Sequence, residues 1–195
     1  MTPDYTQERF HNTMHEIADQ VEINANVLNF ENVLKTITKI LEINDNNSIV
    51  FIYGAGRSGF IGRCFAQRLM HLGIRSCFIS DAITYQYTNK DLLILISGSG
   101  ETTSTVAITK KAKEIGGRII SLSSNPNSTI GRLSDYVIEI KGKSKDVALI
   151  QETLAPYTSL FDISTLAVLD SIGGILMEKL NITEKDIDNR HASIE

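Results

Sequence analysis

The sequence predicts an α/β fold, built around a doubly wound parallel sheet of about five strands. Short apolar runs rich in β-formers alternate with longer stretches of helical periodicity, which is typical of strand–helix–strand units. Glycine-rich loops follow two of these runs, as expected where a parallel strand leads into a helix. The chain has 195 residues, 42% of them hydrophobic, which is enough for one sizeable core.

Two amphipathic helices are expected before the sheet. The first carries an apolar stripe at helical spacing, made of Phe10, Met14, Ile17 and Val21. The second covers residues 30–41 and follows a candidate cap at Asn29. Both core packing and a subunit interface would explain the stripe. We favour an interface, because this helix precedes the sheet and can pack outward.

The rest of the chain alternates between the two kinds of element. Strands are expected near residues 48–53, 74–80, 91–97, 118–123 and 136–140, and helices near 58–71, 103–115 and 156–180, with a short helical turn within 125–135. This alternation favours the flavodoxin-like strand order 2-1-3-4-5. We expect a single domain over 1–195, with N-terminal helices (1–44), an α/β core (45–182) and a C-terminal tail (183–195).

Composition excludes several classes of function. The net charge of −4 and the lack of a basic block give no support to nucleic-acid or acidic-membrane binding. Cys64 and Cys77 match no metal spacing and are interpreted as reduced core thiols. His11 and His15 lack the glutamate of a zinc helix, so we expect no metal. A polar N-terminus and no membrane-spanning run favour a cytoplasmic protein.

Two loops share one design. Residues 54–58 and 98–102 both read G-x-G-x-[ST], and each lies between a predicted strand and a predicted helix. Glycine permits positive φ and close approach of a ligand, and a helix start offers unpaired N–H groups to an anion. In the order 2-1-3-4-5, the first and third strands are neighbours where the winding reverses. The two loops should therefore face each other across one crevice.

The anion itself has more than one interpretation. The first loop also satisfies G-x-G-x-x-G through Gly54, Gly56 and Gly59, and Asp81 ends the second strand as a ribose-binding carboxylate would. The second loop, SGSGETTST at 97–105, instead offers many hydroxyls, which suit a terminal phosphate monoester. We favour the phosphomonoester. A dinucleotide, or capped helix starts without a ligand, are the alternatives.

The two loops resemble those of the SIS, or sugar isomerase, domain family. The motifs that carry the resemblance are GAGRSG at 54–59 and ISGSGET at 96–102, supported by KKAKEIGG at 110–117, SSNPNS at 123–128 and the ending RHASIE at 190–195. The resemblance implies a homotetramer with active sites between subunits, a phosphosugar ligand, and no metal or organic cofactor.

The ending of the chain implies a particular activity within this family. It is similar to isomerases that interconvert 3-hexulose 6-phosphate and fructose 6-phosphate in the ribulose monophosphate pathway of formaldehyde handling. A non-catalytic phosphosugar-sensing module and another sugar-phosphate isomerase are the alternatives.

The resemblance also assigns roles to residues. It implies that Ser97, Ser99 and Thr102 bind the phosphate with help from the Gly98 backbone, that Gly56 and Ser58 face the sugar, and that Arg57, Glu101 and His191 have polar roles. Two positions depart from the family pattern, because Asp81 and Asp162 stand where glutamate is usual. Each carboxylate is therefore one methylene shorter.

Moving a carbonyl between C3 and C2 requires a group that removes and returns a proton. Glu152 is our first candidate, because it lies between the last strand and the final helix, near the crevice rim. An ordinary solvated glutamate at a helix start is an equally simple explanation. Glu101 is a candidate for orienting Arg57 or the loop. His191 is a candidate acid or oxyanion donor, provided the tail crosses to a neighbouring subunit.

Overall fold

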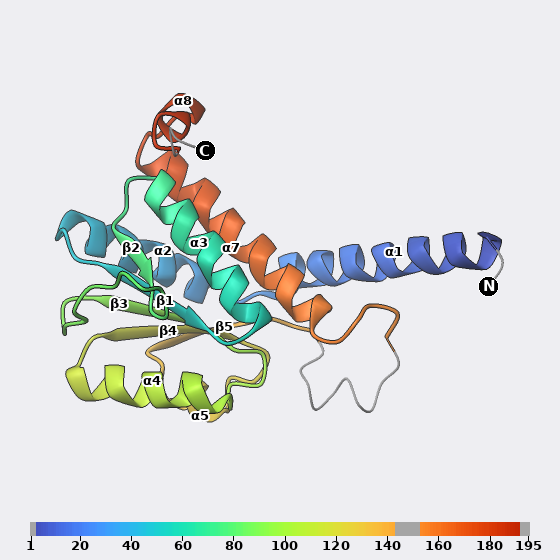
Figure 1. Cartoon of the computed structure of the whole chain (residues 1–195), viewed down its shortest axis with the longest axis horizontal. Helices are drawn as coiled ribbons and strands as arrows, with labels where there is room; N and C mark the ends of the chain where they lie inside the picture. Colours follow the sequence, from blue (N-terminus) through green and yellow to red (C-terminus); the bar gives the residue numbers. More distant parts are fainter. Residues whose placement is uncertain (1–2, 143–152, 192–195) are drawn as a thin grey trace.

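The computed structural model describes residues 3–142 and 153–191. Its sheet has five parallel strands in the order β2-β1-β3-β4-β5 (Figure 1). The strands are β1 (Val50–Gly54), β2 (Ser76–Phe78), β3 (Leu92–Ile96), β4 (Arg118–Ser123) and β5 (Tyr136–Glu139). The predicted fold class and strand order are confirmed.

Helices cover both faces of this sheet (Figure 1). They are α1 (Pro3–Val27), α2 (Phe30–Asp45), α3 (Arg57–His71), α4 (Thr103–Ile115), α5 (Thr129–Leu133), α7 (Ser159–Lys179) and α8 (Glu184–Asp188). Helices α2 and α3 pack on one face, and α4 and α5 pack on the other. Helix α7 contacts α1, α2 and α3, so it forms a further layer beyond the first face.

The core explains why the strands read as continuous apolar runs. All five residues of β3 are buried, because helices cover the sheet on both sides. Helix α7 is long and apolar enough to cross a membrane by length and composition, but 56% of its most apolar window is buried inside the fold. Its apolar character is therefore explained by core packing.

Local signals in the sequence set several element boundaries. Asn29 caps α2 as predicted, since its side chain accepts hydrogen bonds from the N–H groups of Glu31 and Asn32. Gly116 ends α4 in the left-handed conformation, with φ of 92°. Strand β2 is shorter than predicted, because it lies at the sheet edge and has only β1 as a neighbour.

The prediction that both cysteines are core thiols was wrong. Cys64 is exposed and Cys77 is half-buried, and both are free thiols. The inward face of α3 is formed instead by residues such as Phe65 and Leu69, and Cys64 lies off that face.

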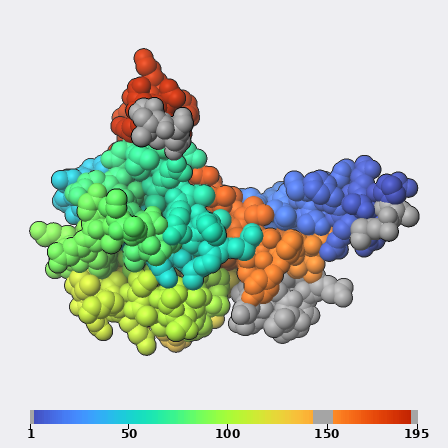
Figure 2. Space-filling view, viewed as in Figure 1, coloured from blue at the N-terminus to red at the C-terminus, as the bar shows by residue number. Residues whose placement is uncertain are grey.

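Helix α1 extends away from the rest of the molecule (Figures 1 and 2). Two members of its predicted apolar stripe, Phe10 and Met14, are 62% and 55% exposed. The stripe therefore remains available at the outer half of the helix, as the interface interpretation requires.

The inner half of α1 is attached to the domain by polar contacts. The buried side chain of Asn24 accepts a hydrogen bond from the N–H of Lys141 at 2.7 Å and donates one to the Lys141 carbonyl at 2.6 Å. Glu16 accepts a hydrogen bond from the N–H of Ala155 at 2.6 Å, and Arg9 donates one to the Leu154 carbonyl. Helix α1 thus holds the backbone on both sides of residues 143–152.

Candidate active site

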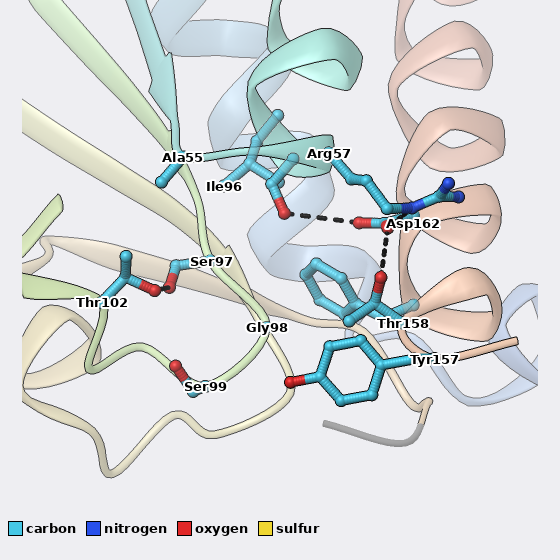
Figure 3. A pocket seen from close by; sticks show the side chains of 12 residues that line it. Ala55, Arg57, Ile96, Ser97, Gly98, Ser99, Thr102, Tyr157, Thr158 and Asp162 are labelled. Atoms are coloured by element: carbon cyan, nitrogen blue, oxygen red, sulfur yellow. Dashed lines mark hydrogen bonds and ion pairs between the residues drawn. The ribbon is translucent and has the colours of Figure 1, made fainter. Parts of the chain in front are cut away.

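The two glycine loops open into one cleft of about 280 Å³ at the carboxyl ends of β1 and β3 (Figure 3). The start of α7 forms its third side. The predicted binding residues that line it are Arg57, Ser58, Ser97, Gly98, Ser99 and Thr102. Gly56 is the one predicted binding residue outside this lining, and it caps α3 directly behind it. The structure therefore brings both loops together as the sequence indicated.

The first loop needs its glycines for backbone approach. A Cβ at Gly54 would lie 2.8 Å from the Ser58 backbone, and one at Gly59 would lie 2.6 Å from the Gly54 carbonyl. Gly56 adopts φ of 58°. These positions allow α3 to begin immediately after β1, with the free N–H groups of its first turn at the cleft.

The second loop combines hydroxyls with a helix start. Ser97 Oγ accepts a hydrogen bond from the N–H of Gly100 and lies 3.2 Å from Thr102 Oγ1. Ser99 Oγ accepts from the N–H of Glu101 at 3.2 Å. Thr102 occupies the cap position of α4 without making a capping hydrogen bond. The loop therefore offers hydroxyl groups and the positive end of α4 to an anion.

The start of α7 adds a buried carboxylate to the cleft (Figure 3). Asp162 is 1% exposed and accepts three hydrogen bonds: from Arg57 Nε at 2.9 Å, Ser58 Oγ at 3.3 Å and Thr158 Oγ1 at 2.7 Å. The ion pair with Arg57 and these hydroxyls balance its burial. The carboxylate thus connects the first loop to α7.

Sequence reasoning missed most of this third side. Asp162 was singled out only for its length, and Tyr157, Thr158 and Phe161 were not predicted, although all line the cleft. Thr158 has φ of 66°, a backbone conformation that costs a residue other than glycine about 1–3 kcal/mol. The available signal was the run PYTSLFD, in which aromatic and hydroxyl side chains gather directly before the final helix.

Glu101 lies beside the second loop but is not part of the cleft lining. Its carboxylate accepts a hydrogen bond from the N–H of Thr129 at 2.7 Å, and this contact, with the Thr129 hydroxyl, lowers the pKa of Glu101. Among the described residues, the carboxylate partner of Arg57 is Asp162. Glu101 therefore ties the loop to α5, and a direct part in catalysis stays a prediction.

His191 lies at the far end of α3 from the cleft. Its ring centroid is 4.2 Å from that of His71, and Arg190 donates a hydrogen bond to the His71 carbonyl. Burial lowers the pKa of His71, and the nearby His191 and Arg68 lower it further. At 1.5 Å per residue, α3 separates this contact from the cleft by about 20 Å. His191 can therefore serve an active site only in a neighbouring subunit.

Glu152 and Asp81 are the remaining candidates. Glu152 lies outside the described residues, so its role as the base stays a prediction. Asp81 pairs with Arg63 at 3.0 Å and lies outside the cleft lining. Its position does not support the ribose-binding role considered for it.

Fold and site together define an α/β protein that binds an anion between two helix starts. The family model for the SIS domain matches residues 42–165. The chain is 39% identical to a 3-hexulose-6-phosphate isomerase of Methanocaldococcus jannaschii over 74% of this chain and 76% of that protein. It is 37% identical to one of Bacillus subtilis, over 75% of this chain and 80% of that protein. The protein belongs to the SIS domain family.

A solved relative agrees with this assignment. The structure of an Escherichia coli CFT073 protein in complex with a phosphosugar ligand has a TM-score of 0.83 to this chain and 25% sequence identity. The match covers 98% of this chain and 100% of the E. coli chain.

Proposed function

We propose that this protein is a ketose-phosphate isomerase that interconverts 3-hexulose 6-phosphate and fructose 6-phosphate through an enediol or enediolate. The observation that carries the proposal is the single cleft formed by the two loops, in which hydroxyls and a helix start can bind a terminal phosphate. The isomerases of M. jannaschii and B. subtilis support the choice of substrate.

The chemistry divides between two parts of the site. The phosphate is remote from the bonds that change, so its binding energy fixes the orientation of the sugar. Glu152 moves the proton between the two carbons, and His191 of a neighbouring subunit stabilises or protonates the oxygen. Glu101 supports the phosphate loop through its bond to Thr129. The proposal requires no metal or organic cofactor.

A coupled assay tests the function directly. Purified protein is mixed with 3-hexulose 6-phosphate, and the appearance of fructose 6-phosphate is followed. Turnover supports the proposal, and no turnover with any phosphosugar contradicts it. Heat stabilisation by sugar phosphates without turnover would instead indicate a sensing module, and stabilisation by NAD or NADP alone would indicate a dinucleotide enzyme.

The active form is proposed to be a cytoplasmic homotetramer of the ribulose monophosphate pathway, with sites between subunits. Two apolar surfaces support association. One is the exposed stripe of α1, and the other is a groove of about 270 Å³ between α1, α2 and α7 that includes Val21, Phe30 and Ile172. We expect light scattering of the intact chain to report a tetramer. A monomer at micromolar concentration would contradict both the assembly and the role of His191.

Replacing Ser99 by Ala should weaken substrate binding more than it slows the reaction. The variant loses a hydroxyl that faces the phosphate and is remote from the reacting carbons. We expect KM to rise about tenfold while kcat falls less than threefold. Steady-state kinetics with 3-hexulose 6-phosphate checks this. An unchanged KM would remove Ser99 from the phosphate site.

A further inference from the structure

The two sides of the cleft offer opposite kinds of hydrogen-bonding group. On the side of α4, Ser99 Oγ accepts from a backbone N–H, so its own proton is free to be donated to a ligand. The first-turn N–H groups of α4 are donors as well. This side therefore matches phosphate oxygens, which only accept.

The side formed by α7 and the first loop has the reverse polarity. A hydroxyl has one proton to donate, and those of Ser58 and Thr158 are both donated to Asp162. The lone pairs of the two oxygens are what remains for a ligand. This side therefore matches groups that donate, as sugar hydroxyls do.

Charge reinforces the difference. The first turn of α3 also lies at the cleft, and alone it would attract an anion as α4 does. The buried carboxylate of Asp162 already occupies this position, and its partner Arg57 neutralises it. In Figure 3 the guanidinium of Arg57 points away from the loop that carries Ser97 and Ser99. A doubly charged phosphate is thus favoured at α4.

From this we infer that Asp162, Thr158 and Ser58 form the subsite for the hydroxyl-bearing end of the sugar phosphate. The inference rests on the proposed function. Asp162 acts as a positioning residue, because it fixes the protons of the two hydroxyls that contact the sugar. The left-handed backbone of Thr158 is the local cost of directing its hydroxyl to Asp162.

The test compares two ligands that share a phosphate. Calorimetry measures the Kd of fructose 6-phosphate and of inorganic phosphate for the wild type, Thr158→Val and Ser99→Ala. Valine keeps the shape and β-branching of threonine and removes only the hydroxyl, so the backbone strain is matched. We expect Thr158→Val to weaken fructose 6-phosphate binding about tenfold and to change phosphate binding less than twofold. Ser99→Ala should weaken both ligands.

A second variant tests the positioning role. Asp162→Asn keeps the shape of the side chain, but its amide nitrogen donates and cannot accept from a hydroxyl. We expect it to raise KM for the sugar phosphate at least tenfold, while phosphate binding stays within threefold of the wild type. If this variant does not fold, Thr158→Val decides the question alone.

Other outcomes overturn the inference in distinguishable ways. Equal losses for both ligands in Thr158→Val, or no loss for fructose 6-phosphate, would remove the subsite while the wild type still turns over substrate. A wild type that binds inorganic phosphate but neither binds nor converts fructose 6-phosphate would overturn the proposed function, and the inference with it.

Discussion

The Glu152→Gln variant is expected to lose about 10²–10⁴-fold in kcat, with little change in stability. Glutamine keeps the size of the side chain but cannot accept the proton that isomerisation removes from the carbon next to the carbonyl. The measurement is kcat for 3-hexulose 6-phosphate, together with the Tm of each protein.

The matched control for this variant is Glu178→Gln. Glu178 is an exposed residue near the end of α7, far along that helix from the cleft, and the same chemical change there should leave kcat unaltered. Activity of Glu152→Gln within a few-fold of the wild type would show that another group transfers the proton.

The Gly100→Ala variant should lose both stability and substrate binding. A Cβ at this position would lie 1.9 Å from Ser128 Oγ, and the backbone has φ of +67°. Left-handed backbone and overpacking together are expected to destabilise the protein by about 2–4 kcal/mol. The loop must shift to admit the methyl group, so phosphate binding at Ser97 and Ser99 should fall as well. Urea unfolding and calorimetry with inorganic phosphate measure the two effects.

Gly174→Ala provides the comparison. No atom lies within 4 Å of a Cβ at Gly174, and alanine favours a helix, so this variant should be neutral or slightly more stable. If Gly100→Ala unfolds like Gly174→Ala and still binds phosphate, the second loop does not depend on its glycine geometry.

The sheet and its two loops could be predicted from the sequence, because their signals are local. Apolar runs of strand length, glycines at strand ends and hydroxyls at helix starts are adjacent in the chain, and the rule for parallel sheets then places β1 beside β3. The cap at Asn29 and the end of α4 at Gly116 were readable for the same reason.

The third side of the cleft could not be predicted in this way. Asp162 meets Arg57 and Ser58 across more than a hundred residues of sequence, so their contact depends on how α7 packs against α3. Whether Thr158 precedes the helix or belongs to it depends on one left-handed backbone angle, and threonine gives no sign of that angle. The pairing of His191 with His71 likewise depends on where the chain turns after α7.

Helix α1 links quaternary structure to turnover. Asn24 and Glu16 bind the backbone at Lys141 and Ala155, the two borders of the stretch that carries Glu152, while Phe10 and Met14 lie bare on the outer half of the same helix. Any neighbour that covers Phe10 and Met14 stiffens the rod that braces these borders. Specific activity should therefore depend on protein concentration, and dilution would slow the enzyme before it unfolds.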